Sequence, residues 1–476
     1  MPLIIVLMGI ILLLLLMMVV KLDAFFSLII TALFVGLLSG IPLLEIIHVI
    51  CNGVGQTMGN IILILCFGAM LGKLIEHSGA AHAIVYKLTA LFGLKKIQYA
   101  ILITGFLVGL PMMYNASFLV LIPIIYTFAS TTGLPLLYLG IPLAATLSIA
   151  HGYLPPHPAP TYVSFIYGAD LNKTLLVGLV PVIPACLFAG IYLSKFFKHI
   201  KVSPPKNLFE NKHIPEEKRP GLAISIFTAI TPVILMLFGA LIDIFIQTPP
   251  KGVQLDYMAI SASFISIPLF NSVAGYLLTT LKFFSEPNMA LLAAVLLGIY
   301  TLGIRRGETM GEIMKLLGKS VSAIGMIILI IGAGGAFSFI LREGGVNEYI
   351  GQITANIQVN PLLLAFCTAA ILRLAVGSAT VATMTAAPIM LPIALSSGVS
   401  PELMVLATGS GSLLFSHFND VGFWMFKEYF NVSIKQTFAI WTVMESIVGL
   451  VGLGACLLMD QFMGRIPAEN IITALF

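Results

Sequence analysis

Two polar stretches decide the fold: residues 148–161, SIAHGYLPPHPAPT, and residues 416–423, SHFNDVGF. Each interrupts an otherwise apolar sequence, and their histidines, His151 and His417, are 266 residues apart. The same offset relates two glycines and a proline of the first half to residues of the same type in the second half: Gly68 and Gly334, Gly79 and Gly345, and Pro135 and Pro401. The sequence therefore indicates one membrane unit present twice, with its polar residues at the same point in each copy.

The composition is that of a membrane protein. Of the 476 residues, 59% are hydrophobic and 9% are charged, whereas soluble proteins carry about a quarter charged residues. Apolar runs of about 20 residues, enough for a helix to cross a bilayer, recur along the chain, and we expect roughly 11–14 hydrophobic segments. A β-barrel would instead alternate apolar and polar residues along its strands. The predicted fold class is an all-α polytopic membrane protein.

The charged residues and the cysteines indicate which loops face the cytoplasm and limit the expected partners. Basic residues cluster in 87–96, 195–219 and 305–319, and the positive-inside rule places these loops in the cytoplasm. The net charge of +4 gives no indication of a nucleic-acid partner. The five cysteines are odd in number and form no CxxC pair, so we expect neither a disulfide framework nor a metal site. No cofactor is expected.

The repeat divides the chain into four parts. We expect a first membrane repeat over 1–193, a basic cytoplasmic loop over 194–221, a linker helix and the start of the second repeat over 222–288, and a second membrane repeat over 289–476. Internal symmetry of this kind is typical of secondary transporters. We expect the two repeats to be inverted relative to each other, because this is common in transporters of this architecture. The broken segments do not allow the membrane crossings between the repeats to be counted, so this expectation does not rest on a count.

The first polar stretch cannot be continuous α-helix. Its four prolines, Pro155, Pro156, Pro158 and Pro160, remove backbone donors and clash with preceding carbonyls. An ordinary surface loop is the alternative interpretation. Residues 134–169 contain no Lys, Arg, Asp or Glu, however, and the solvent loops of this chain do carry charges. Inside a membrane such a break occurs only where protein or water satisfies the backbone groups, so we expect it to line a cavity.

Two glycine-containing patches, residues 109–118 and 375–385, are predicted to be the tips of re-entrant hairpins. In the first, GLPMMYNASF, Gly109 and Pro111 stop a helix and leave polar side chains. The second, AVGSATVATMT, is rich in Ser and Thr. These side chains could also serve helix packing. The polar residues of the two patches are Tyr114, Asn115 and Ser117 in the first, and Ser378, Thr380, Thr383 and Thr385 in the second.

The two polar stretches supply further candidate residues for substrate binding and ion coupling. His151 and His417 could carry protons or hydrogen-bond a substrate, since imidazole titrates near neutral pH, or they could bridge helices. Asp420 could hold a proton or cation, because an ionisable group at membrane depth usually faces a cavity, or it could cap the following helix. The expected substrate-binding set is Tyr114, Asn115, Ser117, His151, His157, Thr161, Ser378, Thr380, Thr383, Ser416, His417 and Asn419, and the expected coupling set is Asp420, His417 and His151.

Two further charged residues lie in apolar runs. Arg373 precedes the second patch, and Glu445 lies within WTVMESIVGL. Arg373 could pair with a substrate carboxylate, and Glu445 could take part in ion coupling. A structural partner, or for Arg373 a snorkelling position near the interface, is the interpretation that we favour.

Several long strings resemble the gluconate permease family of bacterial symporters, which includes carriers of gluconate, idonate and D-serine. They are GAMLGKLIEHSG, GIPLAATLSIAHGYLPPHPAPT, ADLNKTLLVG, LRLAVGSATVA and SPELMVLATGSGSLLFSHFNDVGFWMFKEYF. The resemblance covers nearly the whole chain. It implies a proton-coupled carrier of a small hydroxylated carboxylate in the bacterial inner membrane, with scaffold helices, a mobile substrate domain and a homodimeric assembly.

The chain departs from the family at one position. Relatives usually carry a glutamate in a phrase like PLFFEVGF, whereas this chain has PMMYNASF, with Asn115 at that place and Ser117 where glycine is usual. Asparagine does not titrate, so the resemblance places the coupled proton on another group, chiefly Asp420. A D-serine or other organic-acid carrier coupled to Na⁺, or to no ion, is the alternative that this departure leaves open.

Two other functions are weaker interpretations. An intramembrane metal-dependent hydrolase built on the histidines and Asp420 would be expected to carry an HExxH or GxSxG motif, and the chain has neither. A channel would normally form its filter around the axis of a symmetric oligomer. A Walker motif is also missing from the sequence, so ATP is not expected to drive transport within this chain.

Replacing the departing residue tests its importance. Asn115→Glu should change the pH dependence of uptake or the preferred substrate, because it adds a titratable carboxyl group. Initial uptake rates of several sugar acids, measured over a range of pH in cells that express each protein, would show the change. Unaltered profiles would mean that Asn115 is not central to coupling or selectivity.

Overall fold

A computed structural model describes residues 2–200, 202, 219–246, 268–346 and 359–463. The described residues form helices and connecting turns, with no β-strand among them. The helices of the first half, with their short 3₁₀ and π segments, are α1 (Pro2–Met18), α2 (Ala24–Leu38), α3 (Leu43–His77), α4 (Ala80–Phe92), η1 (Leu94–Lys96), α5 (Ile97–Gly109), α6 (Tyr114–Thr132), α7 (Leu136–Tyr153), α8 (Pro158–Tyr167), α9 (Leu171–Ala185), η2 (Cys186–Tyr192) and α10 (Leu193–Phe197). Those that follow are α11 (Leu222–Ile246), α13 (Pro268–Ser285), α14 (Pro287–Gly298), η4 (Ile299–Gly303), η5 (Ile304–Arg306), α15 (Met310–Ala323), α16 (Gly325–Glu343), α18 (Pro361–Val376), α19 (Ala379–Ser396), α20 (Pro401–Gly411), α21 (Val421–Phe430), α22 (Ile434–Thr437), η6 (Phe438–Thr442) and α23 (Val443–Met463).

The fold confirms the all-α membrane class. Within the described residues, nine helices are long and apolar enough to cross a membrane, or ten if the bent pair α4 and η1–α5 counts as one span. Three shorter apolar helices, Ile4–Met18, Ala24–Leu38 and Pro361–Val376, are additional. The expected 11–14 hydrophobic segments therefore include helices that are too short to cross a bilayer alone.

Helix boundaries recur at the offset seen in the sequence. The first residues of α1 and α13, Pro2 and Pro268, are 266 residues apart, and the last residues of α3 and α16, His77 and Glu343, are separated by the same number. This recurrence favours two copies, although their borders and relative orientation stay predictions. Of the expected basic loop over 194–221, residues 201 and 203–218 lie outside the described part.

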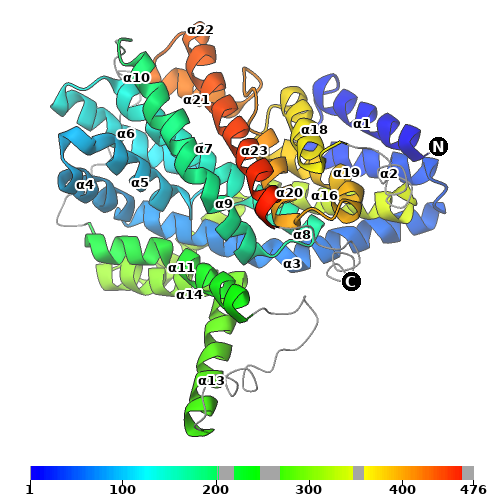
Figure 1. Ribbon diagram of the computed structural model, residues 1–476, viewed down its shortest axis with the longest axis horizontal. Helices are drawn as coiled ribbons and strands as arrows, with labels where there is room; N and C mark the ends of the chain where they lie inside the picture. The colour runs from blue at the N-terminus through cyan, green and yellow to red at the C-terminus, as the bar shows by residue number, and fades with distance from the viewer. Residues whose placement is uncertain (1, 201, 203–218, 247–267, 347–358, 464–476) are drawn as a thin grey trace.

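The longest helix, α3, runs through the molecule and contacts α2, α14, α15 and α16. Figure 1 shows it crossing from the first helices of the chain to the group formed by α4–α7, with α11 and α14 beneath and α13 projecting away. Residues of the second half are thereby packed against helices of the first. Large apolar side chains such as Phe196 and Ile183, about 70% exposed, cover the outer surface and suit a lipid environment.

Small residues allow α3 and α16 to pack closely. A β-carbon added at Gly53 would lie 2.8 Å from the Gly335 carbonyl oxygen and 2.8 Å from the Ala336 α-carbon. Lipid tails are as apolar as the helix surfaces, so the hydrophobic effect contributes little to helix association in a membrane. Helices associate there through close packing, which small residues allow. The glycine therefore sets the separation of these two helices.

Gly53→Ala should lower the melting temperature of the purified protein, because the methyl group must push the α16 backbone away. Gly59→Ala on the same helix provides the matched control, since a β-carbon there meets no atom within 4 Å. Thermal unfolding of both variants in one detergent would measure the difference. Equal melting temperatures would show that this crossing does not limit stability.

Candidate functional site

Four helix breaks meet near the middle of the molecule. They lie between α5 and α6 (residues 110–113), α7 and α8 (154–157), α18 and α19 (377–378), and α20 and α21 (412–420). Prolines account for the second break, since Pro155 and Pro156 lie between the two helices and Pro158 opens the next. Gly377 accounts for the third, because its φ of +81° is costly for other residues. Whether the helices on either side return to the same membrane face stays a prediction.

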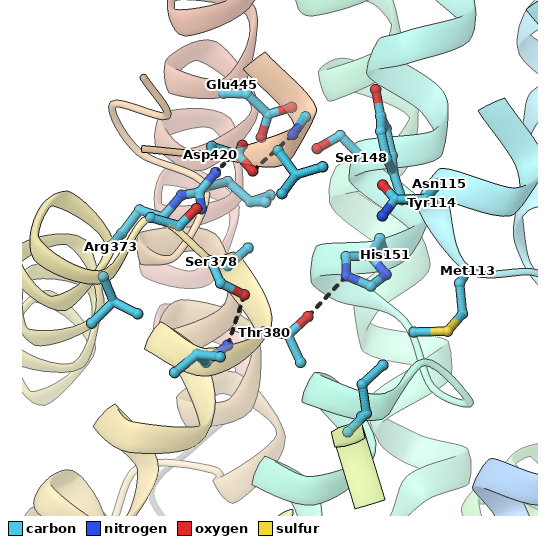
Figure 2. Close-up of a pocket in the computed structure, with 18 of the residues that line it drawn as sticks. Met113, Tyr114, Asn115, Ser148, His151, Arg373, Ser378, Thr380, Asp420 and Glu445 are labelled. Atoms are coloured by element: carbon cyan, nitrogen blue, oxygen red, sulfur yellow. Dashed lines mark hydrogen bonds and ion pairs between the residues drawn. The ribbon is translucent and has the colours of Figure 1, made fainter. Parts of the chain in front are cut away.

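Three of the breaks, the first, third and fourth, border a cavity of about 500 Å³, together with His151 near the end of α7. Figure 2 shows side chains from the first half of the chain on one side and side chains from the second half across from them. The polar side chains that line the cavity are Tyr114, Asn115, Ser148, His151, Arg373, Ser378, Thr380, Asn419, Asp420, Trp441 and Glu445. The cavity thus combines hydroxyl, amide, imidazole, guanidinium and carboxyl groups.

A buried ion pair forms the charged end of the cavity. Nη2 of Arg373, a side chain that is 2% exposed, lies 2.5 Å from Oδ2 of Asp420, which is 14% exposed. Nη1 of Arg373 donates to the Gly377 carbonyl at the break between α18 and α19. Its Nε atom has no hydrogen-bond partner among the described residues. One of the three guanidinium nitrogens is therefore left unsatisfied by its surroundings.

Asp420 is fixed from several directions. Its Oδ1 accepts a hydrogen bond from the backbone N–H of Gly422 at 2.9 Å, so Asp420 is the N-cap of α21. The Ser416 hydroxyl donates to Oδ2 at 2.5 Å, and Nε1 of Trp441 donates to Ser416 Oγ at 2.7 Å. The capping role that the sequence allowed is thus present, together with the contact to the cavity.

Glu445 brings a second carboxyl group to the cavity. It lies on α23 and is 1% exposed, and its Oε1 atom has no hydrogen-bond partner among the described residues. Ser148 of α7 lines the cavity beside it, as Figure 2 shows. Two carboxyl groups and one arginine therefore share this end of the cavity.

The histidine of the first break links both halves of the chain. Nε2 of His151 lies 3.1 Å from the Thr380 hydroxyl in the first turn of α19 (Figure 2). Its Nδ1 lies 3.4 Å from Nδ1 of His157, which is 4% exposed. Hydrogen bonds thus run from Thr380 through His151 to His157.

The structure brings about half of the predicted site together. Seven predicted residues line the cavity: Tyr114, Asn115, His151, Ser378, Thr380, Asn419 and Asp420. Six others do not: Ser117, His157, Thr161, Thr383, Ser416 and His417. Ser117 donates to the carbonyl of Met113, the N-cap residue of α6, and Thr383 donates to a carbonyl within α19. Thr161 is buried in α8. Ser416 supports Asp420, as described above.

His417 takes a different place from His151. Its Nδ1 lies 3.1 Å from the Phe415 carbonyl oxygen, and its ring packs against Phe418 with centroids 4.6 Å apart. The two histidines occupy matching sequence positions but contact different surroundings. Arg373, Glu445, Ser148 and Trp441, by contrast, were outside the predicted binding set and line the cavity.

Comparison with known proteins places the chain in a family. Residues 1–462 match the sequence profile of the GntP family permeases. The chain belongs to this family. Permease-family membership, together with the apolar helices, makes it a multi-pass transporter of the bacterial inner membrane and not an enzyme.

Similar permeases cover almost the full chain. A high-affinity gluconate transporter of Escherichia coli is 43% identical over 97% of this chain and 100% of its own length. The Gnt-II system L-idonate transporter of the same organism is 42% identical over 95% and 98%, and a gluconate permease of Bacillus licheniformis is 40% identical over 97% and 100%.

Two solved structures share the fold. The YdaH transporter of Alcanivorax borkumensis superposes with a TM-score of 0.56 and 15% identity, covering 87% of each chain. MtrF of Neisseria gonorrhoeae superposes with a TM-score of 0.59 and 15% identity, covering 88% of this chain and 85% of its own. The GntP permease fold is therefore shared beyond the range of close sequence similarity.

Arg373→Met should destabilise the protein by about 3–5 kcal/mol, because it leaves a buried carboxylate without its cation. Adding Asp420→Asn should restore part of this loss, since asparagine removes the unpaired charge and still caps α21. Thermal unfolding of the single and double variants would test this. A double variant no more stable than Arg373→Met would contradict the ion-pair account.

Proposed function

We propose that this permease imports a small hydroxylated carboxylate of the gluconate or idonate type by proton symport. The observation that carries the proposal is the cavity in which one buried arginine faces a set of hydroxyl, amide and imidazole groups. Its volume of about 500 Å³ suits a small organic ligand, since such sites measure roughly 300–1,000 Å³. The names of the similar gluconate and idonate carriers point to the same substrate class.

The cavity offers different partners to the two ends of such a molecule. Arg373 is the one lysine or arginine among its described lining residues, and a guanidinium binds a carboxylate through parallel hydrogen bonds. Asn115, Ser148 and Thr380 supply donors and acceptors for hydroxyl groups. The carboxylate end therefore binds at Arg373 and the polyol end extends toward His151 and Asn115.

Proton coupling follows from competition for Arg373. A substrate carboxylate that binds Arg373 takes the place of Asp420 Oδ2, which lies 2.5 Å from the guanidinium. Asp420 then has a buried carboxylate without its cation, a state that costs several kcal/mol. Uptake of one proton by Asp420 removes this cost. Substrate binding and proton binding thus favour each other, and a proton gradient drives accumulation.

The protein reconstituted in liposomes should accumulate labelled gluconate when the outside is more acidic. Asp420→Asn should abolish this accumulation and keep gluconate exchange, because the asparagine cannot take up the coupled proton while the arginine remains. Accumulation and exchange measured on the same vesicles would separate the two processes. Glu428→Gln is the matched control, since Glu428 also lies on α21 but is 59% exposed and away from the cavity.

Accumulation by Asp420→Asn equal to that of the parent would contradict the coupling role. A sodium gradient that drives accumulation where a proton gradient does not would contradict proton symport. Exchange that fails to saturate would point to a pore. The homodimer implied by the family resemblance also stays a proposal, which the molecular mass of the purified protein in detergent would test.

A further inference from the structure

A second cavity adjoins the first. It has a volume of about 320 Å³, and its wall is formed by α3, by the breaks before α6 and α8, and by α15 and α16. The two cavities share four lining residues, namely Met113, Ala116, Ala323 and Ile327. Two of these are alanines, one is an unbranched methionine and one is a β-branched isoleucine. The partition between the cavities is therefore thin and made of side chains, with no charged group in it.

The second cavity carries a net positive charge. Lys73 and Glu76 of α3 form an ion pair with Nζ and Oε1 2.6 Å apart, so their charges balance. Lys319 of α15, an exposed residue, also lines the cavity and has no hydrogen-bond or ion-pair partner among the described residues. One uncompensated ammonium group therefore remains, which favours a ligand with a single negative charge.

His157 adds a polar group to the same wall. It is 4% exposed, and its Nε2 atom is buried without a hydrogen-bond partner among the described residues. It is also the N-cap of α8, whose first residue, Pro158, lines the cavity. The N-terminal end of a helix carries partial positive charge. The lysine, the imidazole and the helix end together form surroundings suited to an anion with hydrogen-bonding groups.

The cavity lies toward the basic clusters of the chain. Lys319 belongs to the cluster over 305–319, and Lys73 lies in the last two turns of α3, next to His77. Nε2 of His77 lies 2.9 Å from Oε1 of Glu308, so the end of α3 is held beside that cluster. The positive-inside rule assigns the cluster to the cytoplasm. The second cavity is therefore on the cytoplasmic side of the first.

We infer that the second cavity is a second binding site for the carboxylate substrate, occupied after the first on the way to the cytoplasm. The inference rests on the proposed function for the identity of the ligand. A carboxylate that leaves Arg373 must cross a region of low dielectric, and an unpaired charge there is costly. Lys319 offers the next cation along this path. The hydrogen bond between His151 and His157 joins the polar walls of the two sites.

Substrate protection of introduced cysteines tests this inference. Ala69→Cys places a thiol on the wall of the second cavity, and Ala379→Cys places one on the wall of the first. Met70→Cys is the matched control, because residue 70 is also half-buried on α3 but lines neither cavity. Each is introduced into a variant whose five native cysteines are replaced and which retains gluconate uptake. The rate of modification by N-ethylmaleimide is then measured with and without gluconate.

Gluconate should slow modification at positions 69 and 379 but not at position 70. Lys319→Gln should raise the gluconate concentration needed to protect position 69 by about tenfold, the loss expected for one charged hydrogen bond, and leave protection at position 379 unchanged. This second result separates occupancy of the site from a change in shape transmitted from the first cavity.

Protection at position 379 alone would overturn the inference and leave the proposed function intact. Protection at position 69 that Lys319→Gln does not weaken would also overturn it, because the ammonium group would then hold no anion. Absence of protection at both positions, together with absence of gluconate uptake by the parent protein, would instead overturn the proposed function.

Discussion

Backbone hydrogen bonding in a hydrocarbon environment is the constraint on which the rest of this structure depends. A helix interrupted inside a membrane leaves N–H and C=O groups that lipid cannot satisfy, so protein groups or water in a cavity must satisfy them. Here Ser378 and Asp420 cap α19 and α21, Arg373 donates to the Gly377 carbonyl, and Asn419 donates to the Leu374 carbonyl. All four side chains also line the cavity. At the breaks before α19 and α21, the groups that satisfy the helix ends are therefore also groups that give the cavity its chemistry.

Because the same side chains stabilise helix ends and line the cavity, only some of their contacts can change during transport. The two carboxylate oxygens of Asp420 have different partners. Oδ1 accepts a hydrogen bond from the α21 backbone, and Oδ2 accepts from Arg373 and Ser416. Exchange of partners at Oδ2 leaves the helix cap in place. Protonation at that oxygen is therefore compatible with an intact α21, whereas a change at Oδ1 would expose backbone donors. The geometry separates a structural oxygen from one that is available for coupling.

The sequence predicts the helix breaks well because their causes are local. Proline and glycine act on the backbone next to them, so the ends of α7 and α18 follow from LPPHPAP and from Gly377. Contacts between distant residues are different. Arg373 and Asp420 are 47 positions apart, and periodicity gives no reason to join them. Glu445 lies farther along still, and only the packing of α23 brings it to the cavity. Matching positions also mislead, since His151 lines the cavity and His417 contacts its own loop.

The two halves of the chain contribute unequally to the cavity, and this inequality makes its two ends chemically different. The first half supplies side chains without formal charge, such as Asn115, Ser148 and the hydrogen-bonding ring of His151, while Arg373, Asp420 and Glu445 all come from the second half. Two chemically equal copies would offer a charged end on both sides and would hold a monocarboxylate equally well either way round. With charge on one side only, a molecule that has one carboxylate and several hydroxyl groups fits in one direction. The cavity thus has two chemically distinguishable ends, one lined by the arginine and carboxyl groups of the second half of the chain and one lined by the amide, hydroxyl and imidazole groups of the first half.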